Sequence, residues 1–189
     1  MSLLLALLCG LIVGWAHGGS LVKLAQLPLR CGWLILIAFL LQIVAFSPQL
    51  ESLGWSDHLG PALYISSILV LLLAVDLNLS LSGMKILGLG LLLNFLVIAA
   101  NGGYMPVPLD NLARAGMAHR AELLQAKGYL SNSTVLTSET RFPFLADVFF
   151  LPPWLPFSNV FSIGDVFIGI GAFILVLQAM QGRNNTSSA

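Results

Sequence analysis

Hydrophobic residues form five long runs along the chain, separated by short polar segments and, once, by a long one. About 17–25 apolar residues in a helix cross a bilayer core, so each run predicts a transmembrane helix, several of them short for a full crossing. Glycine interrupts the first run, which could tilt or dip part way, so four spans are the alternative to five. The predicted spans lie near Met1–Ala16, Cys31–Phe46, Gly60–Val75, Ile86–Ala100 and Phe161–Met180.

Composition supports the same fold class, an all-α integral membrane protein with a single polytopic domain over residues 1–189. The chain is 58% hydrophobic and 8% charged, whereas globular domains have about 25% charged residues. Eight basic and eight acidic residues balance, and no basic stripe with interleaved aromatics indicates nucleic-acid binding. The expected partner is therefore the lipid bilayer.

Neither Cys9 nor Cys31 has the spacing of a metal or redox site, so we expect both to be small apolar residues and expect no cofactor. No basic region precedes the first apolar run, which favours a retained membrane segment over a cleaved signal peptide.

Basic residues in the short loops predict the orientation. The first loop, the third loop and the tail contain Lys or Arg. The second loop contains neither, and its charged residues are Glu51 and Asp57. We therefore expect the N-terminus outside and the C-terminus in the cytoplasm of a bacterial inner membrane, with residues 101–160 outside and residues 182–189 disordered. The tryptophans are predicted interfacial anchors: Trp15, Trp33, Trp55 and Trp154.

Residues 101–160 are too long for a plain connection, so they predict an ordered outer cap. Within it, "DNLARAGMAHRAELLQAKG" is typical of one amphipathic helix along the membrane surface, beginning at Asp110 and ending at Gly128. This helix is either a solvated packing element or a substrate lid. His119 and Arg120 on it are expected to be solvated, and His58 is a lone histidine in the facing loop.

Asp147 and Asp165 stand at the entrance of the last apolar run, where an ionisable group requires an explanation. Ser162 and Asp165 have the spacing of a capping box, which would explain Asp165 as a helix cap. Asp147 precedes Val148 without such a helical run to cap.

Two carboxyl groups that meet share one proton near neutral pH, since the first charge opposes the second. One then acts as a base toward water and the other as an acid toward a scissile carbonyl. A transition metal would also require His or Cys, and none lies nearby in the sequence, so we expect no metal.

"AANGGYMPVP" ends the fourth span with residues that stop a helix and turn the chain. Two interpretations remain open: a helix cap with a turn, or Asn101 donating hydrogen bonds into a polar site. Asn94, in the middle of the span, is expected to bond between helices.

"FLADVFF" followed by "FSIGD", eighteen residues after Asp147, resembles the C-terminal signature of lipoprotein signal peptidase (signal peptidase II). The resemblance implies that Asp147 and Asp165 form a catalytic dyad. "NGGYMP" is similar to that family's Asn and Gly segment, which implies that Asn101 and Gly103 bind substrate, together with Ser162. Ser162 and Gly164 stand where that family has Asn and Ala. The whole chain also resembles an uncharacterised family of bacterial membrane proteins, which implies no activity.

The specific functional hypothesis is a membrane-embedded aspartic hydrolase that acts on a lipid-linked or transmembrane peptide at the outer leaflet. Its main rival is a non-catalytic accessory or structural subunit of a larger membrane complex, in which Asp165 caps a helix and Asp147 holds the outer loop. A small-molecule carrier comes third, because few charged residues lie inside the spans.

Overall fold

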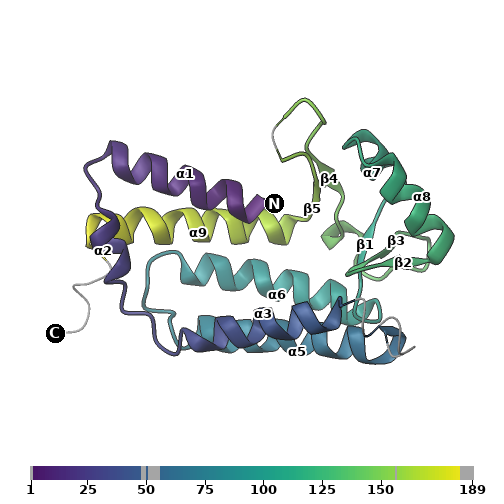
Figure 1. Cartoon of the computed structure of the whole chain (residues 1–189), viewed down its shortest axis with the longest axis horizontal. Coiled ribbons are helices and arrows are strands. Elements are labelled where there is room, and N and C mark those ends of the chain that lie inside the picture. Colours follow the sequence, from purple (N-terminus) through teal and green to yellow (C-terminus); the bar gives the residue numbers. More distant parts are fainter. Residues whose placement is uncertain (1, 48–49, 51–55, 156, 184–189) are drawn as a thin grey trace.

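A computed structural model describes residues 2–47, 50, 56–155 and 157–183 of the chain. The predicted anchor Trp55 lies outside these residues. Residues 184–189 of the predicted disordered tail also lie outside them. The apolar helices lie side by side in the order α1, α9, α6, α5, α3 (Figure 1). Each matches a predicted apolar run to within a few residues: α1 Ser2–Ala16, α3 Trp33–Ala45, α5 Ser56–Asp76, α6 Met84–Ala100 and α9 Ile163–Gln181.

Length divides these helices into two groups. Within the described chain, His58–Asp76 and Ile163–Gln181 are long and apolar enough to cross a membrane, whereas α1, α3 and α6 are apolar but shorter. A 13-residue helix such as α3 is about 20 Å long, against a bilayer core of about 30 Å. Length and composition thus give two candidate membrane spans, and five crossings stay a prediction.

Helix α9 packs between α1 and α6, and glycines allow close approach on both sides. Toward α6, a Cβ on Gly171 would lie 2.5 Å from the Leu87 nitrogen, and a Cβ on Gly90 would lie 2.7 Å from the Ile168 nitrogen. Toward α1, a Cβ on Gly10 would lie 3.2 Å from the Val176 Cβ. Such small residues are typical of helix packing in membranes. The short helix α2, Leu21–Ala25, also packs on α9.

The cap begins where α6 ends. Asn101 is the C-cap of α6, and Gly102 and Gly103 have φ of +70° and +89°, so the predicted helix stop and turn are confirmed. A small sheet follows in which β3 pairs parallel with β1 and antiparallel with β2. Its strands are β1 Met105–Val107, β2 Tyr129–Leu130 and β3 Ser133–Val135.

The predicted single amphipathic helix is wrong in its continuity: the chain forms α7, Leu109–Arg114, and α8, Ala118–Lys127. The break occurs at Gly116, whose φ of +79° is left-handed and incompatible with a continuing α-helix. Asp110 lies in the first turn of α7 but is not its cap, because Pro108 holds that position. The predicted end is confirmed, since Gly128 is the left-handed C-cap of α8.

Candidate functional site

A β-hairpin at the inner edge of the cap brings the two aspartates toward the same place. Strands β4, Phe149–Phe150, and β5, Val160–Phe161, pair antiparallel with Phe149 opposite Phe161. Asp147 lies just before β4, and α9 begins just after β5. The base of the hairpin therefore carries Asp147 on one side and the first turn of α9, with Asp165, on the other.

Asp165 is held by the predicted capping box, which the structure confirms. The Ser162 amide donates to Asp165 Oδ2 at 3.1 Å, and the Asp165 amide donates to Ser162 Oγ at 3.0 Å. Asn94 of α6 donates from Nδ2 to Asp165 Oδ1 at 3.0 Å and accepts from Ser162 Oγ at 2.8 Å. Asn94 thus bonds between helices, as predicted. These bonds fix the carboxylate in place at the start of α9.

Gly164 leaves space for the Asn94 side chain at the start of α9. A Cβ at this position would collide with Oδ1 of Asn94 and would lie 2.8 Å from the Gly90 carbonyl oxygen. Only glycine therefore leaves room for the Asn94 side chain between Ser162 and Asp165.

Asp147 lacks the polar support that Asp165 receives. Its amide donates to the Pro106 carbonyl of β1 at 3.0 Å, which fixes the backbone. Its side-chain Oδ1 is buried and has no hydrogen-bond partner among the residues that the structure describes. Burial raises the pKa of Asp147 to about 7, and the nearby charge of Asp165 acts in the same direction. The carboxyl is therefore divided between its two protonation states near neutral pH.

A second polar chain lies beside Asp147 and joins the cap to α5. Arg120 is half-buried and donates from Nη2 to Ser133 Oγ at 3.1 Å. Ser133 Oγ donates to Asn132 Oδ1 at 3.4 Å, and Asn132 Nδ2 donates to the Tyr64 hydroxyl at 3.4 Å. The positive charge of Arg120 counteracts the rise in the pKa of Asp147. Arg120 is thus part of the site, and its predicted solvated position is wrong.

Asn101 and Gly103 have structural contacts in this conformation. The Asn101 side chain donates to the carbonyls of Val97, at 2.7 Å, and Arg141, at 2.8 Å, and it accepts from the Arg141 amide at 2.9 Å. A Cβ on Gly103 would collide with Pro61. Asn101 therefore connects the loop at Arg141 to the end of α6 by hydrogen bonds. A substrate-binding role for Asn101 and Gly103 stays a prediction.

The histidines do not join this site. His119 is exposed, as predicted, and lies 3.8 Å from Glu122, while His58 is exposed in α5. No three His, Cys, Asp or Glu of the described chain lie close enough together to hold a metal ion.

Sequence reasoning missed the contribution of Arg120, Asn132, Ser133 and Tyr64. Their roles depend on contacts between the cap and α5, for which no local pattern exists. The signal that could have been used is the pair of apolar segments "VFF" and "NVF", which flank a proline-rich turn and favour a hairpin. That hairpin alone would have placed Asp147 beside the start of α9.

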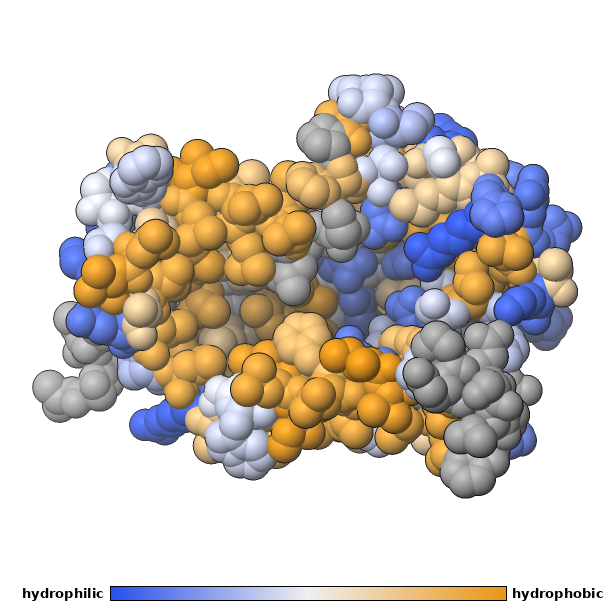
Figure 2. All heavy atoms as spheres, in the orientation of Figure 1, coloured by the Kyte–Doolittle hydropathy of each residue, from blue (hydrophilic) through white to orange (hydrophobic). Residues whose placement is uncertain are grey.

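The surface of the molecule is hollowed where the helix row meets the cap. Figure 2 shows hydrophilic atoms along the cap side of this hollow and hydrophobic atoms along the helix side. In Figure 1 the base of the β4 and β5 hairpin lies at the same junction. The aspartate site thus lies at the boundary between apolar and polar surface.

Residues 26–177 match a family described as "Family of unknown function (DUF5317)". An "Uncharacterized protein" of Thermotoga maritima is 29% identical over 138 residues, which cover 71% of this chain and 71% of the relative. No solved structure is significantly similar to the chain. The predicted resemblance to an uncharacterised family is confirmed. Neither the family description nor the relative's name refers to a peptidase or another activity.

Proposed function

We propose that this chain, which belongs to the family of unknown function DUF5317, is an aspartic hydrolase of the bacterial inner membrane. The observation that carries the proposal is the buried Oδ1 of Asp147, for which the described part of the chain offers no hydrogen-bond partner. This atom lies at the base of a hairpin that also positions Asp165. Two carboxyl groups in such different environments divide the roles of acid and base.

In this proposal Asp147 is the acid and Asp165 is the base. Protonated Asp147 donates its proton to the scissile carbonyl oxygen while Asp165 takes a proton from the attacking water. The tetrahedral intermediate then returns a proton to Asp147, and Asp165 protonates the leaving amine as the C–N bond breaks. The products are one carboxylic acid and one amine, and both aspartates regain their starting states.

The pKa of Asp147, about 7, suits this exchange because an acid or base is most efficient when its pKa lies near the working pH. Asn94 and Ser162 hold Asp165 during the reaction through the bonds seen in the structure. The substrate would be a lipid-linked or transmembrane peptide, since the site borders the apolar helix row (Figure 2).

The test uses purified protein in liposomes with a lipid-modified peptide and, separately, a transmembrane peptide. We expect cleavage by the unaltered chain and a loss of at least about 100-fold in Asp147→Asn and in Asp165→Asn. Asp110→Asn, at an exposed carboxylate of α7, is the matched control and should retain full activity. No cleavage of either peptide by the unaltered chain, or cleavage by the two site variants at the rate of the unaltered chain, would contradict the proposal.

A second candidate is an accessory subunit, and the unpartnered edges of the helix row favour it. α1 and α3 occupy the two ends of the row, and both expose large apolar side chains, among them Ile12 at 65%, Leu36 at 66% and Ile43 at 67%. Another membrane chain could cover either edge. Purification from native membranes in mild detergent tests this role, because a subunit should elute with a partner in fixed ratio.

A further inference from the structure

The loop between β4 and β5 exposes apolar side chains away from the rest of the cap. Residues 148–164 contain no Asp, Glu, Lys, Arg or His. The base of the loop is closed by the Leu151 amide, which donates to the Asn159 carbonyl at 2.8 Å. Beyond it, Trp154 is 78% exposed. A tryptophan so exposed at the end of an uncharged loop indicates a surface that something else covers.

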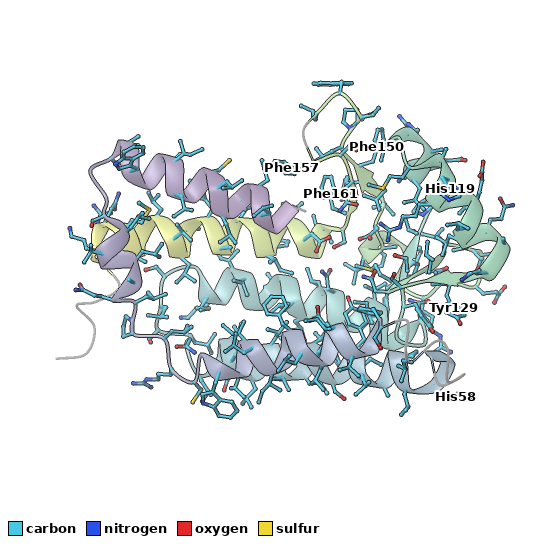
Figure 3. The ribbon with its side chains drawn as sticks, in the orientation of Figure 1. His58, His119, Tyr129, Phe150, Phe157 and Phe161 are labelled. Atoms are coloured by element: carbon cyan, nitrogen blue, oxygen red, sulfur yellow. The ribbon has the colours of Figure 1, made fainter. Side chains whose placement is uncertain are left out.

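The two faces of the hairpin differ. On one face Phe150 lies 4.3 Å from the Arg114 guanidinium carbon, and Val160 belongs to the apolar core of the cap. On the other face the Phe149 and Phe161 rings stack with centroids 5.5 Å apart. Figure 3 shows Phe150 toward α7 and Phe157 on the opposite side, toward the helix row. The cap therefore holds one face and leaves the other face and the tip open.

The position of the hairpin suggests what covers it. α9, one of the two candidate membrane spans, begins two residues after β5. In Figures 1 and 2 the hairpin stands where the hydrophobic surface of the helix row gives way to the hydrophilic cap. For a protein embedded by this row, that border is the level of the lipid headgroups.

We propose that Trp154 and Phe157 insert into the headgroup and upper acyl region of the bilayer leaflet on the cap side. Tryptophan is enriched at this depth because its ring combines an apolar body with an N–H donor. Because residues 148–164 carry no charge, their entry into the headgroup region does not require burial of a charged side chain. The apolar surface of the helix row continues to the hairpin base (Figure 2). The bilayer thereby fixes the hairpin whose base carries Asp147. This anchoring does not depend on hydrolysis.

The test makes Trp154 the sole tryptophan by replacing Trp15, Trp33 and Trp55 with Phe. The variant is placed in phosphatidylcholine and phosphatidylglycerol liposomes with bromine at defined acyl positions. We expect emission shifted to shorter wavelength, strong quenching by bromine near the headgroup, weaker quenching by deep bromine and little quenching by aqueous iodide.

The matched control adds Trp154→Phe and Glu122→Trp to the same background, so that its sole tryptophan lies on α8. Glu122 is suitable because its side-chain exposure of 77% is close to that of Trp154. It should be quenched by iodide and unaffected by bromine. If the sole-tryptophan chain does not fold, the unaltered chain is compared with Trp154→Phe, and the lost bromine quenching reports Trp154 directly.

Iodide quenching of Trp154 equal to that of the control would overturn the proposal. Shielding from both quenchers would also overturn it, in favour of a second copy or another protein on the hairpin. The same measurement on Asp147→Asn separates anchoring from catalysis, since quenching should be unchanged whether or not the chain is a hydrolase.

Discussion

Asp147 combines a fixed backbone with an unsupported carboxyl group. Its amide donates to the Pro106 carbonyl, while its buried Oδ1 has no hydrogen-bond partner within residues 2–47, 50, 56–155 and 157–183. An ionised carboxylate there loses hydration without gaining hydrogen bonds, so folding favours the protonated form. A carboxyl group in such an unfavourable position affects the stability of the fold.

The stability of the fold should therefore fall as pH rises through the range in which Asp147 ionises. Its pKa moves from 3.8 to about 7 on folding, so between these values the folded state binds more protons than the unfolded state. The free energy of unfolding decreases with pH over this range, by at most about 4 kcal/mol, and becomes independent of this group above about pH 7. Melting temperature in detergent at pH 5, 6, 7 and 8.5 measures the decrease.

Asp147→Asn removes the ionisation and should flatten this dependence, with a higher melting temperature than the unaltered chain at pH 8.5. Asp110→Asn, at an exposed position, should leave the pH dependence unchanged. A pH profile that is identical in the unaltered chain and in Asp147→Asn would show that Asp147 ionises freely.

Asp165→Asn should have two effects. Loss of the ionised cap weakens the start of α9 by about 1 kcal/mol. Removal of the Asp165 charge also lowers the pKa of Asp147, since that charge raises it, so the pH at which stability is lost should move down. Melting temperatures measured across pH separate the two effects. The weaker cap lowers the melting temperature at every pH, whereas the lower pKa of Asp147 moves the midpoint of the pH dependence to lower pH. An unmoved midpoint would mean that the two carboxyl groups are not coupled.

At the scale of elements, the contact between α6 and α9 depends on the absence of side-chain atoms. Gly164→Ala should destabilise the protein by about 1–3 kcal/mol, because its Cβ would collide with Asn94 and crowd Gly90. Gly169→Ala on the same helix is the control, since its Cβ would lie 3.5 Å from that of Ala6, an ordinary contact. The melting temperature of Gly164→Ala should be clearly lower than that of Gly169→Ala. Equal melting temperatures of the two variants would exclude close packing at Gly164.

The apolar helices were predictable because each depends on a local property, a run of apolar residues, that the sequence displays directly. The capping box at Ser162 and Asp165 was predictable for the same reason, since two residues three positions apart determine it. The break at Gly116 was not predicted, because the apolar pattern continues across it and glycine is also tolerated within helices.

The approach of Asp147 to the start of α9 was not predicted, and the only local signal for it is the pair of apolar segments around the proline-rich turn. It depends on β4 and β5, strands of two residues each, which are too short for an alternating pattern. The approach of Arg120 depends on its bond to Ser133, and Asn132 then reaches Tyr64 in α5, 68 residues away. Such contacts are selected by tertiary packing, and the local residue pattern of a single sequence contains no signal for them.

At the scale of the whole molecule, charge is distributed unequally between the two ends of the helix row. The end opposite the cap holds an excess of basic residues: Lys23, Arg30, Lys85 and Arg183, with Asp76. In the cap, basic and acidic residues are mixed, and long segments are translocated largely regardless of charge. This distribution favours an orientation with the cap outside and the opposite end in the cytoplasm.

Single cysteines test that orientation together with the crossing of α6. Cys9 and Cys31, both exposed, are replaced by Ala, and Cys is introduced at Ser138 in the cap or at Ser80 in the connection between α5 and α6, both exposed. In intact spheroplasts a membrane-impermeant maleimide should label Ser138→Cys at once and Ser80→Cys only after permeabilisation.

Two contrary results would have different meanings, because α6 alone separates these positions among the apolar helices. Labelling of Ser80→Cys but not Ser138→Cys would reverse the orientation and leave the crossing intact. Labelling of both from one side would show that α6, with 17 residues, does not cross. The aspartate site would then lie on the same side of the membrane as the basic end. If neither cysteine were labelled before permeabilisation, that side would be the cytoplasm, and a substrate in the outer leaflet could not reach the site.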